Sequence, residues 1–147
     1  MVKSGEYMLI GRYQTKINAK GRAALPAKFK RSLGNRIIIT AGYEQSLMVV
    51  AQKDWQGEID RVTGQSSTLG LTRETDRFLL GSAYEIELDS QGRFIIPKYL
   101  RQYAGLTAEI VFVGVGKRAE IWSQAKWDKY SQYLNQRVKE LGEKLNA

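Results

Sequence analysis

The sequence contains neither cysteine nor histidine, and only two prolines occur among its 147 residues. Without cysteine and histidine, a transition-metal site would have only carboxylate ligands, and thiol or imidazole chemistry is excluded. Seryl, lysyl and carboxylate mechanisms remain open, but no motif in the chain assembles one. The lack of cysteine also fits a reducing cytoplasm. We therefore predict a protein that is not an enzyme and has no catalytic residue, no metal site and no cofactor.

Long apolar runs are also missing from the chain. No run approaches the roughly 20 residues needed to cross a bilayer, and the first ten residues carry no cleavage-site pattern of a signal peptide. The composition, 43% hydrophobic and 26% charged, is ordinary for a globular protein. We expect one domain spanning residues 1–147, located in the cytoplasm and not bound to a membrane.

Acidic residues are absent from one long segment. Between Tyr7 and Tyr43 the chain has eight basic residues and no acidic one, whereas the remaining 110 residues balance 15 basic against 15 acidic side chains. The entire net charge of +8 therefore lies in this segment. Solvated faces normally mix both signs of charge, so this asymmetry favours a polyanionic partner over a merely solvated surface.

The chain contains an internal repeat at an offset of 71 residues. Its first copy runs from Tyr13 to Gly34 and its second from Tyr84 to Gly105, with tyrosine, glycine, arginine, proline and the closing glycine identical. Each copy then continues into two strand-like runs and a tryptophan. We predict internal repeats at residues 12–63 and 83–130.

Each copy begins with the same predicted turn. Asn18 and Gly21 in the first copy, and Asp89 and Gly92 in the second, occupy the first and fourth positions that favour a type I turn. A proline then suits the first position of a short helix, and Gly34 and Gly105 suit left-handed caps at its end. Within these helices, apolar residues spaced by four predict a buried stripe: Phe29 and Leu33, Leu100 and Ala104.

The remaining pattern predicts two strand pairs and three helices. The strand pairs are 36–41 with 47–51 and 109–113 with 118–122. A helix near 53–62 is followed by a polar loop, 64–70, and by a helix to Leu80 that Thr72 would cap. Ser123 would cap a C-terminal helix over 123–145, whose apolar stripe would pack on the chain's own barrel or on a neighbouring subunit.

Neither half is large enough to bury its own sheet faces. We therefore predict a mainly β, α+β fold: one barrel with pseudo-two-fold symmetry in which the two halves interleave their strands.

Four stretches of sequence resemble the MraZ family, which belongs to the AbrB-like swapped-hairpin superfamily. They are Ile17-Asn-Ala-Lys-Gly-Arg-Ala-Ala-Leu-Pro26, Leu88-Asp-Ser-Gln-Gly-Arg-Phe-Ile-Ile-Pro97, Leu100-Arg-Gln-Tyr-Ala-Gly-Leu106 and Val113-Gly-Val-Gly-Lys-Arg-Ala-Glu-Ile-Trp122. The resemblance implies a swapped-hairpin barrel and a transcriptional regulator that binds repeated guanine-containing boxes as a ring-like homo-oligomer. It further implies that these boxes lie in the promoter of its own operon, at the head of the division and cell-wall gene cluster.

Carried over by position, the resemblance makes Arg22 and Arg93 the motif arginines. Asn18 stands where the family usually has aspartate, so the turn is preserved but an ion pair with Arg22 is not. The predicted partner is double-stranded promoter DNA in the nucleoid. We predict base contacts from Arg22, Lys20 and Arg93. Predicted phosphate contacts come from Arg12, Lys16, Lys28, Lys30, Arg31 and Arg101, and the predicted turn residues are Asn18, Gly21, Asp89 and Gly92.

Several alternatives remain open at this stage. Arg93 has a purely structural alternative, in which it pairs with Asp89, and we expect the first copy rather than the second to face DNA. Gly114-Val-Gly116 superficially matches a dinucleotide fingerprint, but it lacks a following helix and reads as a hairpin turn. Rival functions are an antitoxin-like interaction module, a double-ψ-barrel enzyme or its relic, and RNA binding. A C-terminus patterned as a packed helix, rather than a flexible tail, argues against an antitoxin.

Overall fold

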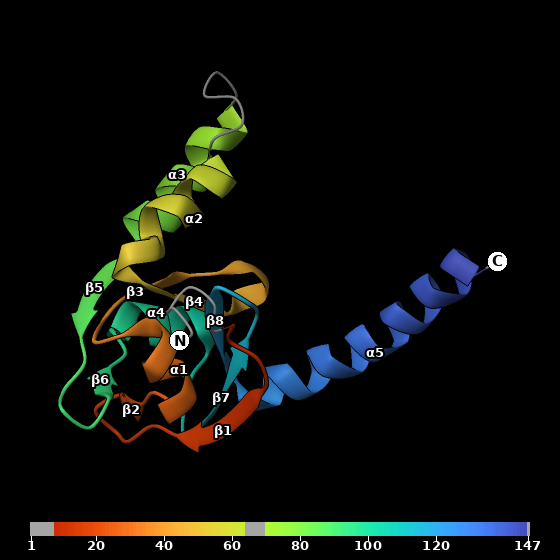
Figure 1. Ribbon diagram of the computed structural model, residues 1–147. Helices are drawn as coiled ribbons and strands as arrows, with labels where there is room; N and C mark the ends of the chain where they lie inside the picture. Colours follow the sequence, from red (N-terminus) through yellow and green to blue (C-terminus); the bar gives the residue numbers. More distant parts are fainter. Residues whose placement is uncertain (1–7, 64–69, 147) are drawn as a thin grey trace, which may run out of the picture.

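The computed structural model describes residues 8–63 and 70–146. Apart from short helical turns, each copy of the repeat has the order strand, strand, helix, strand, strand, helix (Figure 1). The first copy contains β1 (Arg12–Lys16), β2 (Arg22–Ala24), α1 (Ala27–Leu33), β3 (Arg36–Ala41), β4 (Leu47–Ala51) and α2 (Trp55–Thr63). Helix α3 (Gly70–Gly81) lies between the two copies. The second copy contains β5 (Tyr84–Glu87), β6 (Arg93–Ile95), α4 (Lys98–Ala104), β7 (Glu109–Gly114), β8 (Arg118–Ser123) and the start of α5 (Gln124–Asn146).

The strand order confirms the predicted pseudo-two-fold, interleaved fold. The described strands form a six-stranded sheet, in the order β1-β7-β8-β4-β3-β5, and a two-stranded ribbon, β2-β6. Exchanging each strand with its repeat partner (β1 with β5, β2 with β6, β3 with β7, β4 with β8) reverses the order and leaves it otherwise unchanged. Because the pairs β1-β7, β4-β8, β3-β5 and β2-β6 all join different copies, neither copy forms its own sheet.

The main hydrophobic core lies between the sheet, the ribbon and the two short helices. The inward residues of α1 and α4, predicted from their spacing of four, are buried as expected: Phe29 and Leu33, Leu100 and Ala104. Tyr13 packs edge-on against Phe29 with ring centroids 5.1 Å apart. Both short helices therefore contribute their inward faces to this core.

The ends of three helices differ from the sequence prediction. Pro26 and Pro97 have ψ angles of 139° and 142°, so each caps its helix from outside instead of being its first helical residue. Gly105 is left-handed as predicted, but Gly34 combines a positive φ with a ψ of −165° and is not a left-handed cap. Helix α3 begins at Gly70, so Thr72 lies inside the helix and not at its cap.

Helices α2 and α3 form a hairpin that projects from one side of the sheet (Figure 1). Leu79 packs with Ile38, Met48 and Val50 on the outer face of the sheet. The predicted helix at 53–62 is present as α2, preceded by a short helical turn at Gln52–Asp54. Most of the predicted polar loop, 64–70, lies outside the described residues.

The chain segment before β1 is attached to the β7–β8 hairpin. Leu9 exchanges backbone hydrogen bonds of 2.7 and 3.0 Å with Gly116. A Cβ atom on Gly114 would lie 2.5 Å from the backbone nitrogen of Ile10, so only glycine fits there. The Gly114-Val-Gly116 motif is therefore a hairpin turn, as predicted.

Helix α5 packs on the sheet only through its first turns. Ser123 caps it as predicted, because its hydroxyl accepts a hydrogen bond from the backbone nitrogen of Lys126 (3.1 Å). Trp127 is buried against Trp122, and Tyr130 and Leu134 pack beside it. Beyond Leu134 the helix extends away from the sheet (Figure 1), and the rest of its predicted apolar stripe is exposed: Val138 62%, Leu141 41% and Leu145 85%. Of the two expected alternatives, packing on the chain's own barrel therefore holds only for the first turns of the helix, and packing on a neighbouring subunit stays a prediction for the distal half.

Candidate nucleic-acid interface

The first-copy turn presents Lys20 and Arg22 at the surface. The side-chain oxygen of Asn18 accepts hydrogen bonds from the backbone nitrogens of Lys20 (3.0 Å) and Arg22 (2.9 Å). Gly21 closes the turn with a φ of +84°, and its nitrogen donates to the carbonyl oxygen of Asn18 (2.9 Å). Asparagine therefore performs the turn chemistry expected of it, without supplying a negative charge.

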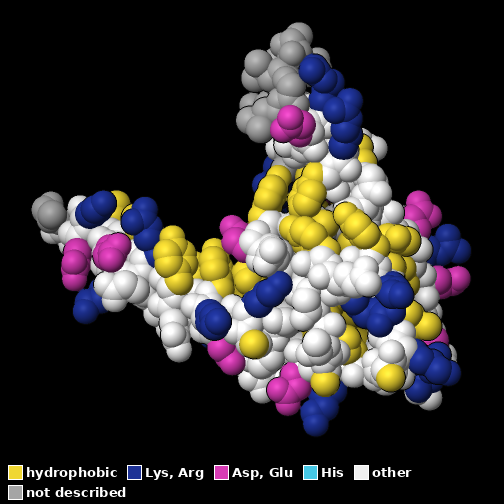
Figure 2. Space-filling model, turned by 180° about the vertical axis from the view of Figure 1, so that it is seen from behind, with side chains coloured by type: hydrophobic (Ala, Val, Ile, Leu, Met, Phe, Trp, Pro, Cys, Tyr) yellow, Lys and Arg dark blue, Asp and Glu magenta, His cyan; other side chains and the backbone are white. Residues whose placement is uncertain are grey.

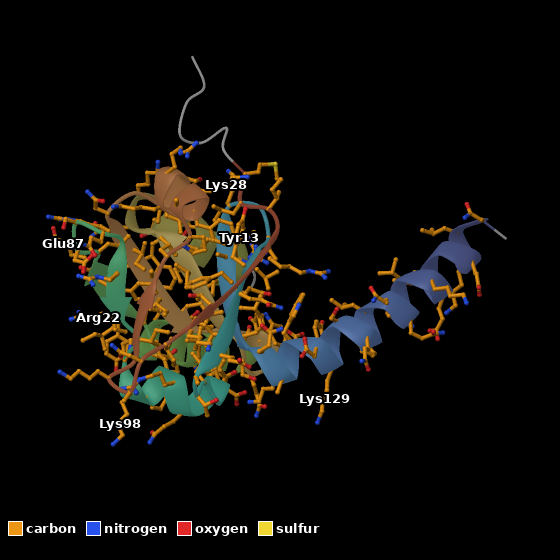
Figure 3. All side chains as sticks on the ribbon, turned by 90° about the horizontal axis from the view of Figure 1, so that it is seen from below. Tyr13, Arg22, Lys28, Glu87, Lys98 and Lys129 are labelled. Atoms are coloured by element: carbon orange, nitrogen blue, oxygen red, sulfur yellow. The ribbon has the colours of Figure 1, made fainter. Side chains whose placement is uncertain are left out.

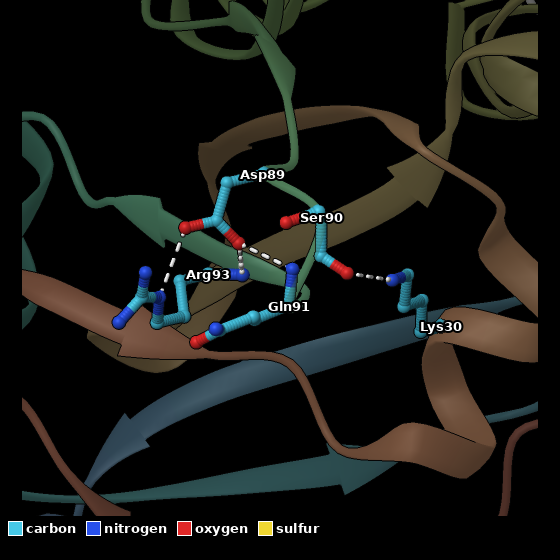
Figure 4. A network of polar contacts seen from close by, with 5 residues as sticks. All are labelled: Lys30, Asp89, Ser90, Gln91 and Arg93. Carbon is cyan, nitrogen blue, oxygen red and sulfur yellow. Dashed lines mark hydrogen bonds and ion pairs between the residues drawn. The ribbon is translucent and has the colours of Figure 1, made fainter.

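The second-copy turn has the same backbone geometry and an added ion pair (Figure 4). Oδ1 of Asp89 accepts from the backbone nitrogens of Gln91 and Arg93, both at 2.8 Å, and Oδ2 accepts from Nε of Arg93 at 2.9 Å. The backbone amide of Arg93 is the main cause that lowers the pKa of Asp89; desolvation opposes it, and the Arg93 side chain and the Gln91 amide add to the lowering. The carboxylate therefore stays ionised and holds the Arg93 guanidinium.

Unlike the side chain of Arg93, the side chain of Arg22 is not held by its own turn. Within the described part of the chain, its guanidinium makes no hydrogen bond or ion pair, and the residue is exposed. The single difference between Asn18 and Asp89 accounts for this, because the amide has no second oxygen to accept from the arginine. One motif arginine is thus held by its own turn, and the other remains available to a ligand.

Both arginines lie on the outer face of the β2-β6 ribbon. The register pairs Arg22 with Ile95, Ala23 with Phe94 and Ala24 with Arg93. Ala23 and Phe94 point into the core, where 2% and 4% of their surfaces are exposed. Because side chains alternate between the faces of a strand, the other four residues of the register point outward. An open groove of about 370 Å³ beside the ribbon brings Arg22 and Arg93 together with Lys16 and Asn18.

The two turns are held by contacts that cross from one copy to the other. The backbone nitrogen of Leu25 donates to the carbonyl oxygen of Gly92, and that of Ile96 donates to Gly21, both at 2.9 Å. Leu25 and Ile96 are equivalent in the repeat, so the two hydrogen bonds obey the pseudo-two-fold symmetry. The residue that follows each ribbon strand is therefore hydrogen-bonded to the turn of the other copy.

Two basic side chains, Lys30 and Arg101, cover the turn glycines in the same reciprocal way. Nζ of Lys30 on α1 donates to the carbonyl oxygen of Ser90 (3.4 Å, Figure 4), and its Cδ lies 3.2 Å from where a Cβ of Gly92 would be. Nε of Arg101 on α4 donates to the carbonyl oxygen of Ile96 (2.8 Å) and lies 2.5 Å from where a Cβ of Gly21 would be. Both predicted phosphate contacts thus also hold the turns in place.

The other predicted phosphate contacts are not gathered in one place. Lys28 and Arg31 are exposed on α1 without a partner among the described residues. In Figure 3, Lys28 lies apart from Arg22. Lys16 lies at the ribbon end of β1, opposite Glu109 of β7. Arg12, at the other end of β1, lies over the ring of Trp127, 5.1 Å from its centroid. The structure therefore gathers Lys16, Arg22 and Arg93, and it separates Arg12 from them.

Sequence reasoning missed the exposed apolar residue of this surface. Ile95 is 47% exposed and lies opposite Arg22. In the sequence it is hidden inside the apolar run Phe94-Ile95-Ile96, which does not reveal which member faces outward. The signal that could have identified it is its spacing of two from Arg93, since residues i and i+2 share one face of a strand.

Other kinds of site have little support in the described residues. Residues 8–63 and 70–146 contain no group of three or more carboxylates placed to hold a metal ion. No helix in these ranges is long and apolar enough to span a bilayer. The fold and the site instead define a class: an internally duplicated, swapped-hairpin protein that displays two motif arginines on a two-stranded surface ribbon.

Comparison with known proteins gives the family. A sequence model described as "MraZ protein, putative antitoxin-like" matches residues 8–78 and again 79–143, one match for each copy. A relative named "Transcriptional regulator MraZ" from Thermoanaerobacter pseudethanolicus is 38% identical over 143 residues, covering 95% of this chain and 97% of the relative. Relatives of the same name from Carboxydothermus hydrogenoformans and Acetivibrio thermocellus are 38% and 36% identical over 138 residues, covering 94% of this chain and 96% of each relative.

The chain belongs to the MraZ family. Membership places it among transcriptional regulators and outside the enzymes, as the sequence predicted.

Proposed function

We propose that this transcriptional regulator binds duplex DNA by inserting the β2-β6 ribbon into the major groove. The major groove admits a two-stranded β-ribbon, and this ribbon has its arginines on the face that points away from the core. Arg22 and Lys20 of the first copy contact base edges. Arg93 contributes to base contact less, because Asp89 already holds its guanidinium.

The observation that carries this proposal is the state of Arg22. It is exposed, it lies on the outer face of the ribbon, and it has no partner among the described residues. An arginine in this state can give two hydrogen bonds to guanine O6 and N7, which favours guanine over other bases by about 1–3 kcal/mol per good bidentate pair.

The phosphate contacts divide into two groups. Lys16, Lys28 and Arg31 are exposed and give affinity by displacing counterions from the DNA backbone. Arg12, Lys30 and Arg101 contribute less, because each already has a partner within the chain. The proposed footprint therefore centres on the ribbon and on α1, and the proposal keeps the prediction that the first copy faces DNA.

We further propose that the protein acts as a ring-like homo-oligomer on tandem guanine-containing boxes in the promoter of its own operon. That operon heads the division and cell-wall gene cluster, and the protein is then cytoplasmic and associated with the nucleoid. Several weakly binding subunits on neighbouring boxes gain avidity without additional contacts. The exposed apolar face of distal α5 supports self-association, because monomeric proteins rarely leave such a stripe uncovered (Figure 2).

Gel-shift titration on the DNA upstream of the chain's own coding sequence tests this proposal. We expect stepwise complexes that disappear as the boxes are deleted one by one. The affinity should also fall with salt, with a log–log slope of about −0.9 per phosphate contact. Binding that is equal on a scrambled duplex, or that is competed better by RNA than by duplex DNA, would contradict it.

An antitoxin-like interaction module is the second candidate function, and one observation favours it. The distal face of α5 is uncovered within the described chain, so a partner protein is a rival to a second copy as its occupant. Light scattering on the purified chain separates the two: an oligomer that forms without any added protein supports self-association, and a monomer at high concentration supports the module.

A further inference from the structure

The outer face of the β2-β6 ribbon carries two apolar residues as well as two arginines. Ile95 is 47% exposed although both of its chain neighbours, Phe94 and Ile96, are buried. Ala24, its equivalent in the first copy, is exposed too. Neither side chain contributes to the core, so the burial of apolar surface within this chain does not explain Ile95.

The register places each apolar side chain beside an arginine. Ile95 lies directly opposite Arg22, and Ala24 lies directly opposite Arg93. Side chains directly opposite each other on one face of an antiparallel pair have Cβ atoms about 4.5–5.5 Å apart. The arginines therefore occupy one diagonal of the face, and the apolar residues occupy the other.

The surrounding charge argues against a second copy as the partner of this face. Lys16 and Arg22 line the groove beside the ribbon, and Lys20 lies on the adjoining turn. Of the acidic residues nearby, Asp89 is already paired with Arg93, and Glu109 lies opposite Lys16, which leaves Arg22 and Lys20 uncompensated among the described residues. Two copies meeting here would bring like charges together, which disfavours association. An occupant of Ile95 must instead combine negative charge with a small apolar group. The major groove of DNA does so, because phosphates flank it and the C5-methyl group of thymine projects into it.

We propose that Ile95 is a specificity-determining residue that packs against a thymine methyl group next to the base contacted by Arg22. Ala24, which is smaller, makes the weaker equivalent contact beside Arg93. This inference rests on the proposed binding of duplex DNA, and it adds a preference for thymine that no arginine supplies. The ribbon thus recognises a thymine adjacent to a guanine.

Replacing thymine by uracil tests the contact, because it removes only the methyl group. A random duplex library selected on the full chain gives its preferred sequence, which is then prepared by amplification with dTTP or with dUTP. We expect the uracil duplex to bind about four-fold more weakly, the effect of burying one methyl group. Single thymine-to-uracil changes should assign this loss mainly to one position.

Ile95→Ala should abolish most of the difference between the thymine and uracil duplexes, with thermal melting as the check on folding. Ile10→Ala is the matched control, because Ile10 is 70% exposed and lies outside the ribbon, so this variant should keep the full difference. An unchanged uracil penalty in Ile95→Ala, or no penalty in the wild type, overturns the inference while leaving DNA binding intact. A changed oligomeric state in Ile95→Ala overturns it by making Ile95 an interface residue. A library from which no sequence is enriched overturns both this inference and the proposed function.

Discussion

At the scale of single residues, the two turns differ in one side-chain atom: Asn18 has an amide nitrogen where Asp89 has a second carboxylate oxygen. Asn18 and Asp89 accept the same pair of backbone hydrogen bonds, but only Asp89 has a second oxygen that holds an arginine. The first copy therefore leaves Arg22 available to a ligand, and the second fixes Arg93. The two copies therefore differ in the state of their motif arginine, although their turns make the same backbone hydrogen bonds.

Asp89→Asn gives the second turn the chemistry of the first. The pKa of Asp89 is lowered in the fold, chiefly by the backbone amide of Arg93. Its ionised form therefore adds stability above the unfolded pKa, and this stability is lost as the pH falls through the folded pKa. We expect a small decrease in melting temperature for Asp89→Asn at neutral pH that vanishes in acid. A decrease of the same size at all pH values would contradict the ionic role.

Gly21→Ala should destabilise the chain more than Gly92→Ala does. Both glycines have a positive φ, +84° and +77°, which costs a non-glycine residue about 1–2 kcal/mol. At Gly21 the new Cβ would also displace Arg101 from the carbonyl oxygen of Ile96, whereas at Gly92 the closest atom of Lys30 is 3.2 Å away.

Urea unfolding measures this difference. Gly142→Ala in α5 is the control, since a Cβ there meets nothing within 4 Å and should not destabilise the chain. Equal losses for Gly21→Ala and Gly92→Ala would show that Arg101 does not hold the turn.

The features that could be predicted from the sequence are those that depend on residues close together in the chain. The turns, the buried stripes of α1 and α4 and the cap at Ser123 depend on neighbours a few residues away, and all three are as predicted. The roles of Lys30 and Arg101 as covers of the opposite turns depend on contacts across some 60 to 80 residues of chain. No pattern within one copy contains that information.

At the scale of elements, α1 and α4 serve the ribbon as well as the core. Their buried faces pack inward, and their basic residues Lys30 and Arg101 reach over the turns of the opposite copy. The strand pairs were predictable from alternation and apolar runs. The start of α3 and the conformation of Gly34 were not, because sequence signals fix the type of an element better than its ends.

On α1, the exposed residues Lys28 and Arg31 should affect DNA binding more than Lys30, whose amino group already donates to Ser90. Lys28→Gln with Arg31→Gln should flatten the log–log salt slope by up to about 1.8, or 0.9 for each phosphate contact. Lys30→Gln should change the slope less, because the Lys30 amino group already donates to Ser90. Fluorescence anisotropy across a salt series measures the slope for both variants. A larger change in slope from Lys30→Gln would contradict the division of the basic residues into exposed and already partnered ones.

At the scale of the whole molecule, the basic residues that are gathered in one segment of the sequence lie partly beside acidic residues in the fold. Interleaving places Lys16 opposite Glu109 and Arg36 opposite Glu87. The first copy therefore provides most of the cations, but not a uniform basic surface. The distal half of α5 likewise follows its predicted helical pattern, and no part of the chain that the structure describes covers its apolar face. Periodicity predicts that a face is apolar, but it does not reveal what covers that face.

Charges introduced on the apolar face of α5 should dissociate the proposed homo-oligomer without unfolding its subunits. Val138→Glu with Leu141→Glu adds two carboxylates to the exposed stripe, away from the folded core. We expect light scattering to report a smaller species with an unchanged thermal transition of the core. Gln132→Glu with Asn135→Glu adds the same charge to the polar face and should leave the assembly intact. An assembly that resists the first pair and dissociates with the second would place the interface elsewhere.

DNA binding by the Arg22→Ala variant decides whether Arg22 contacts a base from the outer face of the ribbon. Its affinity is compared with that of the wild type on a box-containing duplex and on a scrambled one, with Lys28→Ala as a control that also removes one charge. We expect Arg22→Ala to lose about 1–3 kcal/mol of discrimination between the two duplexes, while Lys28→Ala weakens binding to both alike. Equal losses on both duplexes for Arg22→Ala would contradict this base contact.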